Sequence, residues 1–288
     1  MRIWLLSSGS SGNAAIVQAA PSGRMGEGEG TASGGSGRLL IDAGLGPRAL
    51  ASRMRALGTD LFPRGVDGIV ITHQHGDHIA HLEPLARALR APIFLHQGIS
   101  APRVRARFDV RSYVAGETFK VGAFEVATMS VPHDAPQVAL RIGVAAGLGR
   151  AHGLRFGWVT DLGHVPAGLD RFLGASDEVL LEANYCPDLM RDGPYPPHLK
   201  RRVTGPLGHL ANADAGELAQ ALSRTRVRRL WLGHLSRVNN DPARALSVVR
   251  RFAPGLEVEV LPHGEPRVLD VRAGRRSGYG EQLGLPFG

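Results

Sequence analysis

Seven residues, Thr72-His73-Gln74-His75-Gly76-Asp77-His78, place three histidines and an aspartate directly after the apolar run Gly68-Ile69-Val70-Ile71. Neither the alternation of a strand nor the four-residue repeat of a helix brings all four polar side chains to one point. A tight loop at the end of a buried strand does, and Gly76 would allow the close turn. We therefore predict two pairs of ligands, His73 with His75 and Asp77 with His78, each for a separate cation. Imidazole and carboxylate suit zinc, manganese or iron better than calcium.

Size and composition bound the class of protein. The chain has 288 residues, of which 43% are hydrophobic, so it can bury a substantial core in one large domain or two small ones. No apolar run approaches the ~20 residues that a membrane span needs, and the start Met1–Gly9 is too short for a signal peptide. The single cysteine, Cys186, excludes an internal disulfide framework. We expect a cytoplasmic protein with no membrane partner, and the oligomeric state stays open, a homodimer included.

The net charge of +8 and the pI of about 10.6 fit an anionic partner such as nucleic acid. Lysine occurs only at Lys120 and Lys200, however, so arginine supplies almost all of the positive charge. A GC-rich coding sequence produces the same bias. The charge therefore supports a polyanionic substrate but does not decide for one.

A strand-rich opening followed by alternating strands and helices occurs twice along the chain. We expect the segment from Pro21 to Gly37 to be a flexible hairpin insertion and 272–288 to be a basic, Gly-rich tail, which leaves one domain over 1–271. Alternating strands and helices put the helices outside a sheet. Two such halves face to face give an α/β fold of four layers, an αββα sandwich. The predicted helices lie at 47–57, 79–90, 213–223 and 242–252, and the predicted strands at 3–6, 14–19, 38–44, 66–72, 92–96, 117–121, 123–130, 138–145, 154–160, 179–184, 227–232 and 256–261.

Three further residues stand where metal ligands are expected. His133 follows a strand and a proline, Asp161 follows the apolar run Phe156–Thr160, and His234 follows Arg229–Gly233. A polar residue at the end of an apolar strand often marks a site. Each one alone could be structural, but with the first four they make a set of seven ligands.

The pattern H-x-H-x-D-H followed by a single His, Asp and His resembles the metallo-β-lactamase-fold hydrolases. The likeness extends over roughly residues 1–270 and is closest to the YycJ/WalJ-like subfamily, which is related to the tRNA 3′-processing nuclease and phosphodiesterase branches. The chain departs from the subfamily at the 21–37 insertion, at His81 in place of glycine, and at Ala211 in place of serine. Its supporting motifs are Ser7–Asn13, Leu40–Gly44, Pro132–Ala135, Thr160–Gly163, Glu182–Tyr185, Gly193–Pro196, Gly208–Leu210, His234–Ser236 and Asn239–Asn240.

The resemblance implies two divalent ions, zinc or manganese, and assigns their ligands. It gives one ion to His73, His75 and His133, and the other to Asp77, His78 and His234, with Asp161 bridging both. Two ions about 3.5–4 Å apart clamp an in-line displacement and convert a bridging water to hydroxide. We expect Asp77 to orient this metal-bridging hydroxide or to take its proton.

The fold serves many chemistries, so the substrate has to be argued from other residues. By resemblance to the tRNA-processing branch, His209 protonates the leaving oxygen and Glu182 assists it. We read Arg191–Arg202 as a basic, proline-stiffened loop beside the site, in which four residues could bind a phosphate backbone or stack on a base. These four are Tyr195, Lys200, Arg201 and Arg202.

The predicted function is therefore a dinuclear metal-dependent phosphodiester hydrolase, a nuclease resembling DNA exonucleases, with DNA favoured over RNA as partner. One alternative is a phosphodiesterase for small cyclic phosphodiesters, which a closed pocket would favour. A second is a nucleic-acid-binding protein without catalysis, against which the complete ligand set argues. A lactonase or thioester hydrolase explains neither His209 nor the basic segment.

Overall fold

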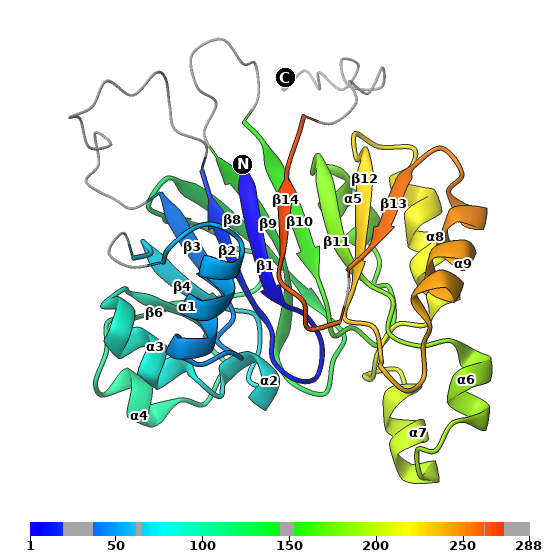
Figure 1. The fold of residues 1–288 in the computed structure, drawn as a ribbon, viewed down its shortest axis with the longest axis horizontal. Coiled ribbons are helices and arrows are strands. Elements are labelled where there is room, and N and C mark those ends of the chain that lie inside the picture. Colours follow the sequence, from blue (N-terminus) through cyan, green and yellow to red (C-terminus); the bar gives the residue numbers. More distant parts are fainter. Residues whose placement is uncertain (20–36, 62–64, 145–152, 262, 274–288) are drawn as a thin grey trace, which may run out of the picture.

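The computed structural model describes residues 1–19, 37–61, 65–144, 153–261 and 263–273. The predicted insertion and tail lie outside these residues except for Gly37, Arg272 and Ala273. The described chain forms two seven-stranded sheets that face each other, with helices on both outer faces (Figure 1).

The first sheet has the order β14-β1-β2-β3-β4-β5-β6. Its members are antiparallel from β14 to β3 and parallel from β3 to β6. Parallel neighbours need crossover connections, and helices supply these on the outer face. The strands span Arg2–Ser7 (β1), Ala14–Gln18 (β2), Arg38–Ile41 (β3), Gly68–Ile71 (β4), Ile93–His96 (β5), Val110–Tyr113 (β6) and Arg267–Asp270 (β14).

The second sheet repeats this plan in the order β13-β12-β11-β10-β9-β8-β7, parallel from β13 to β10 and antiparallel from β10 to β7. The two sheets thus show the repetition that the sequence predicts. The strands span Thr118–Val121 (β7), Phe124–Val131 (β8), Gln137–Val144 (β9), Arg155–Val159 (β10), Glu178–Glu182 (β11), Arg229–Gly233 (β12) and Glu257–Val260 (β13).

The helices divide between the two outer faces and the edge that carries the ligands (Figure 1). Helices α1 and α3 cover the first sheet, while α5, α8 and α9 cover the second. The helices span Pro47–Ala56 (α1), Gly76–Ile79 (α2), Leu82–Leu89 (α3), Pro102–Arg105 (α4), Leu169–Gly174 (α5), Pro187–Asp192 (α6), Pro197–Val203 (α7), Asn212–Leu222 (α8) and Pro242–Phe252 (α9).

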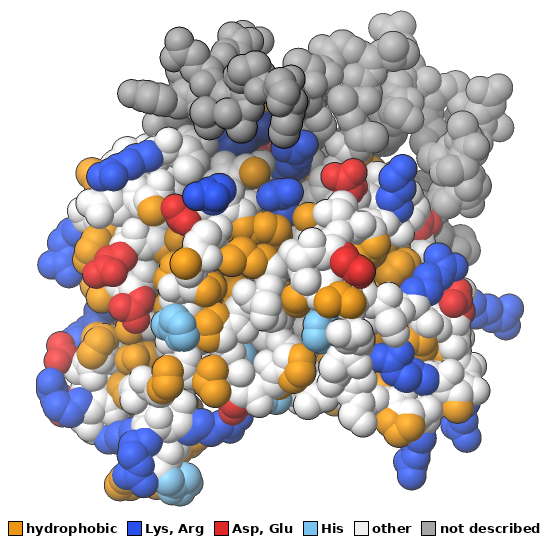
Figure 2. Space-filling view, turned by 180° about the vertical axis from the view of Figure 1, so that it is seen from behind, with side chains coloured by type: hydrophobic (Ala, Val, Ile, Leu, Met, Phe, Trp, Pro, Cys, Tyr) orange, Lys and Arg blue, Asp and Glu red, His pale blue; other side chains and the backbone are white. Residues whose placement is uncertain are grey.

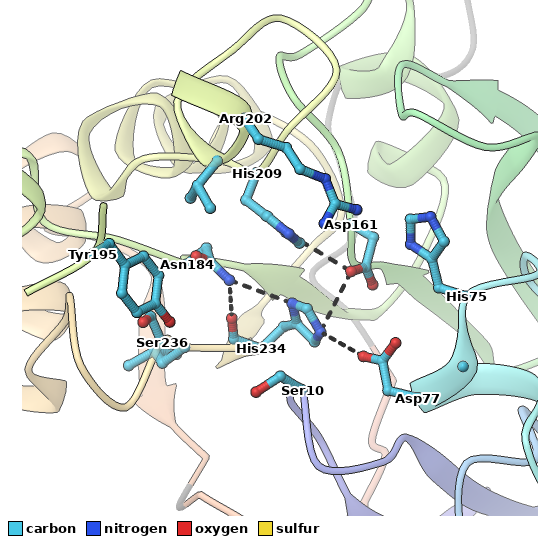
Figure 3. Close-up of a pocket in the computed structure, with 13 residues that line it drawn as sticks. Ser10, His75, Asp77, Asp161, Asn184, Tyr195, Arg202, His209, His234 and Ser236 are labelled. Atoms are coloured by element: carbon cyan, nitrogen blue, oxygen red, sulfur yellow. Dashed lines mark hydrogen bonds and ion pairs between the residues drawn. The ribbon is translucent and has the colours of Figure 1, made fainter. Parts of the chain in front are cut away.

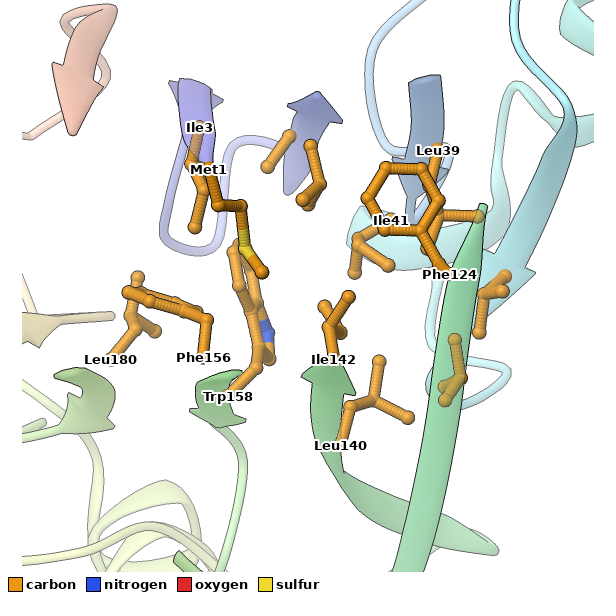
Figure 4. Close-up of a cluster of buried hydrophobic side chains, with 14 of the residues drawn as sticks. Met1, Ile3, Leu39, Ile41, Phe124, Leu140, Ile142, Phe156, Trp158 and Leu180 are labelled. Atoms are coloured by element: carbon orange, nitrogen blue, oxygen red, sulfur yellow. The ribbon is translucent and has the colours of Figure 1, made fainter. Parts of the chain in front are cut away.

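Successive side chains along a strand point to opposite faces of its sheet and so enter two different hydrophobic cores. In β1, Ile3 and Leu5 point into the space between the sheets, whereas Trp4 and Leu6 pack under the helices of the first sheet. The central core brings Trp158 and Leu180 of one sheet against residues such as Ile3 of the other (Figure 4). Complete burial of one such side chain stabilises the fold by about 1.5–3 kcal/mol. The predicted four-layer αββα sandwich is therefore confirmed.

Two predictions about secondary structure were wrong. The predicted helix over 79–90 is broken, because α2 ends at Ile79 and α3 begins at Leu82. The segment 191–202 is not a loop, since it contains the end of α6 and most of α7. Pro187 and Pro197 stand at the first helical positions, where proline's missing N–H costs nothing.

No helix among the described residues is both long and apolar enough to cross a membrane. On the face shown in Figure 2, the Lys and Arg side chains are scattered and do not form one continuous stripe. The net charge of the chain therefore does not by itself mark a binding surface on that face.

Candidate metal centre

The seven predicted ligands meet at one edge of the sandwich, where the carboxyl ends of several strands lie. His73 and His75 follow β4, and Asp77 and His78 lie in the first turn of α2. The other three follow the ends of β8, β10 and β12 and are His133, Asp161 and His234.

The ligand atoms fall into overlapping groups whose members lie within 4.8 Å of one another. One group is His73, His75 and His133, and another is Asp77, His78 and His234. The Asp161 carboxylate lies against the second group, with Oδ2 3.2 Å from His78 Nε2 and Oδ1 3.4 Å from His234 Nε2, and it shares a further close group with His73 of the first group and His78. The residues of each predicted ligand set thus lie together at this edge, and Asp161 lies beside both sets.

Buried polar atoms without partners show that these residues fit metal ions. Among the described residues, His73 Nε2, Asp161 Oδ2 and His234 Nε2 are buried and make no hydrogen bond. An unsatisfied buried polar group costs about 1–3 kcal/mol, so such atoms need a partner. His75 Nδ1 and His133 Nε2 also face each other at 3.1 Å. Several nitrogen and oxygen atoms aimed at shared points are what a cation requires.

The pKa values of the two buried histidines His73 and His78 shift in opposite directions. Burial and the neighbouring His78 lower the pKa of His73 to about 2, which keeps its imidazole neutral. Burial also lowers the pKa of His78, but Asp42 and Asp161 raise it by more, to about 10. For Asp161, burial raises the pKa, and His234 and His78 together hold it well below its usual range. The carboxylates of the site are thus ionised and ready to bind cations.

A second layer of residues orients the ligands. His78 Nδ1 donates to Asp42 Oδ2 at 2.8 Å, and the Thr72 backbone N–H donates to Asp42 Oδ1 at 2.8 Å. Asn13 Nδ2 donates to Asp77 Oδ2 at 3.2 Å and lies 2.8 Å from His78 Nε2. Such contacts set the tautomer and ring orientation of metal ligands. Both residues stand in motifs of the family resemblance, Asp42 in Leu40–Gly44 and Asn13 in Ser7–Asn13, but only Asp42 also follows a strand as the predicted ligands do.

Gly44, and not Gly76, is the glycine that the site requires. A Cβ on Gly44 would lie 1.9 Å from the Asp77 carbonyl oxygen and 2.4 Å from the Asn13 nitrogen. A Cβ on Gly76 would meet nothing within 4 Å, and Gly76 is the first residue of α2. The predicted tight turn at Gly76 is therefore wrong, because a short helix presents Asp77 and His78.

Glu182 and His209 lie beside the ligands as one unit. Glu182 is fully buried, and its Oε1 lies 2.9 Å from His209 Nδ1 and 2.8 Å from His234 Nδ1. Its Oε2 accepts the backbone N–H groups of Leu162 and Leu210. Burial lowers the pKa of His209, but the charge and hydrogen bond of Glu182 raise it by more, so it lies above its ordinary value. The His209 imidazole is thereby held ready to carry a proton.

A cavity of about 370 Å³ opens over this cluster. Of the four predicted substrate-binding residues, Tyr195 and Arg202 line it, and Figure 3 shows Arg202 reaching from α7 toward Asp161 and His75. Lys200 and Arg201 are not brought to the cavity, since Lys200 Nζ donates to the Arg191 carbonyl at 2.6 Å. The cavity lining consists of Ser10, His75, Gly76, Asp77, Asp161, Asn184, Tyr195, Arg202, Val203, His209, His234, Leu235 and Ser236.

Comparison with known protein families gives a match to the β-lactamase superfamily domain over residues 37–235. The chain belongs to this superfamily. The match spans all seven ligands, so the resemblance read from the sequence is confirmed. A superfamily chain with these ligand groups has a divalent-metal site at this edge.

The chain is also similar to individual proteins of known name or structure. The chain is 29% identical over 245 residues to exodeoxyribonuclease WalJ of Streptococcus pneumoniae serotype 2 (strain D39 / NCTC 7466), covering 82% of both proteins. It is 26% identical over 208 residues to exodeoxyribonuclease YycJ of Bacillus anthracis, covering 70% of this chain and 76% of that protein. The metallo-β-lactamase fold protein YhfI of Bacillus subtilis has a TM-score of 0.66 at 16% identity, covering 93% and 98% of the two chains.

Proposed function

We propose that this chain is a metal-dependent phosphodiester hydrolase that degrades nucleic acid, DNA in preference to RNA, from an end. The observation that carries the proposal is the buried Glu182–His209 pair beside a complete set of metal ligands. The relatives named exodeoxyribonuclease support DNA and terminal cleavage. We place the enzyme in the cytosol, in keeping with its single cysteine.

The residues present can hold two divalent ions, zinc or manganese. His73, His75 and His133 would bind one, Asp77, His78 and His234 the other, and Asp161 both. Bound there, such ions neutralise charge on the phosphate and acidify water.

The chain's own residues handle the protons of the reaction. Asp77 lines the cavity and accepts a proton from the attacking water as its oxygen bonds to phosphorus. The P–O bond to the leaving group breaks, and His209 donates a proton to the departing oxygen. Because His209 Nδ1 is engaged by Glu182, Nε2 is the atom left to make this donation.

Two residues at the cavity rim give the substrate its orientation. Arg202 meets a phosphate oxygen, and the Tyr195 ring stacks on a base. Lys200 and Arg201 lie on the same helix but outside the cavity, so we assign them at most a contact with more distant phosphates.

The test is incubation of the metal-loaded protein with end-labelled DNA and RNA and with bis(4-nitrophenyl) phosphate. We expect stepwise shortening of DNA. We expect His209→Ala to keep its metal content and to lose about 10²–10⁴-fold in turnover, the usual contribution of a general acid. His164→Ala is the matched control, because His164 is exposed and its one side-chain hydrogen bond within the described residues is to the Pro206 carbonyl at 2.9 Å. Hydrolysis of the small diester alone, with both polynucleotides intact, would show that nucleic acid is not the substrate.

A further inference from the structure

Asp134 lies between a metal ligand and the arginine at the cavity rim. Its Oδ1 is 3.0 Å from His75 Nε2, and its Oδ2 accepts from Arg202 Nε and Nη2, both at 2.9 Å. Asp134 follows β8, whereas Arg202 belongs to α7, so the carboxylate joins two distant parts of the chain. We propose that Asp134 is a positioning residue that sets the His75 ring for the first metal ion with one oxygen and aims Arg202 at a substrate phosphate with the other.

The geometry at His75 defines the first half of this role. His75 Nε2 donates its hydrogen to Asp134 Oδ1, so Nδ1 carries the lone pair, and Nδ1 is the atom that faces His133 Nε2 at 3.1 Å. The carboxylate therefore selects the tautomer that turns a free nitrogen toward the other ligands of the group. Oδ1 is also 3.4 Å from His133 Nε2, yet Asp134 belongs to none of the close ligand groups of the described chain.

The contact with Arg202 defines the second half. Both bonds from Arg202 end on one oxygen, Oδ2, and Nη1 has no hydrogen-bond partner within the residues that the structure describes. A guanidinium held by one edge keeps its other edge free for a phosphate oxygen. Figure 3 shows the Arg202 guanidinium close to Asp161 and His75.

The Asp134–Arg202 ion pair contributes little to the stability of the fold. The Arg202 and Asp134 side chains are 61% and 32% exposed, and exposed ion pairs contribute about 0–1 kcal/mol. An exposed pair at the mouth of a cavity instead limits the directions in which the arginine can point. The cost of fixing Arg202 is then met in folding and not at each binding event.

The second half rests on the proposed function, whereas the first half concerns metal binding alone, and the experiment separates them. Asp134→Asn, Arg202→Ala and the double variant are compared for zinc affinity by competition with a chelator, and for KM and kcat on DNA. Arg171→Ala, which removes an exposed arginine of α5 outside the cavity lining, controls for lost positive charge. Asp109→Asn controls for loss of an exposed Arg–Asp pair, here with Arg111 at 3.0 Å.

We expect Asp134→Asn to weaken zinc binding about 10–100-fold, as changes behind metal ligands do, whether or not Arg202 is present. Arg202→Ala should keep zinc affinity and raise KM for DNA, and Asp134→Asn should raise KM in the Arg202 background but not in the Arg202→Ala background. Wild-type zinc affinity in Asp134→Asn overturns the role at His75, even if no DNA is cleaved. Additive KM effects in the double variant overturn the role at Arg202, and both controls should behave as wild type.

Discussion

Replacing Glu182 by glutamine should separate what this buried carboxylate does for the fold from what it does for catalysis. All four of its neighbours are donors: His209 and His234 on Oε1, and the backbone N–H groups of Leu162 and Leu210 on Oε2. A glutamine offers one oxygen and one NH₂ group. Whichever way the amide is turned, its NH₂ group faces two of the four donors, and those two lose their acceptor.

The two donors left without an acceptor set the expected loss of stability. Two unsatisfied buried donors at about 1–3 kcal/mol each give a loss of roughly 2–6 kcal/mol in the free energy of unfolding. In a domain of this size that lowers Tm by about 2–4 °C per kcal/mol. Turnover should fall by about 10²-fold or more, since His209 loses the group that holds its proton-donating state.

The pH profile provides the sharper measurement. His209 is an acid in the proposed reaction, so activity is present below its pKa and is lost as pH rises through it. Glu182 raises that pKa, and its neutralisation must lower it. The descending limb of the kcat profile should therefore move to lower pH in Glu182→Gln.

Glu178→Gln is the matched control. Glu178 lies on the same strand, β11, is equally buried, and accepts from Trp231 Nε1 at 2.9 Å and from Arg228 Nε at 3.1 Å, away from the cavity. It should lower stability while leaving kcat and its pH limb unchanged. The reasoning is refuted if Glu182→Gln loses stability like the control but keeps wild-type turnover and pH dependence.

Three further outcomes are expected. Chelation should lower Tm, because buried atoms such as His73 Nε2 lose their partner, and readded zinc should restore it by an amount that grows with its concentration; a Tm insensitive to both treatments contradicts the metal assignment. Asp161→Asn should reduce the bound metal, measured by elemental analysis, and abolish activity with the far-UV CD spectrum kept, whereas normal turnover in a metal-replete variant rules out the bridging role. Gly44→Ala should weaken zinc binding, because its Cβ would strike the Asp77 carbonyl, while Gly76→Ala, which has open space, should bind zinc as wild type does.

Periodic features of the sequence predicted the structure well. Strands such as β4 and β10 are apolar runs that end in a polar residue, and that ending is what placed Asp161 among the ligands. Polar residues after such strands marked single candidates far apart in sequence, and the family resemblance joined them into one set of seven ligands.

Contacts without a repeating pattern were not predictable. Strand β14 has four residues of mixed exposure, pairs only through β1 in the described chain, and shows no clean alternation. Helices α6 and α7 are short and begin with proline, which reads as a loop when packing is unknown. Asp134 was visible as a neighbour of His133, but its pairing with Arg202 depends on how α7 packs over the edge.

Backbone conformation shows what the centre demands of the turns that carry its polar side chains. Asp42, Asp161 and His234 follow the ends of β3, β10 and β12, and all three adopt left-handed φ angles of 58°, 59° and 54°. For residues with a Cβ this conformation costs about 1–2 kcal/mol each. It persists because each side chain turns back to a polar partner, Asp42 to His78 and His234 to Glu182 among them. Glycine would relieve the backbone strain but remove the polar side chain, so the strain is the consequence of requiring a polar side chain at these three turns. The sheets on either side hold the ends of these strands, so the packing of the fold offsets the strain of the three turns.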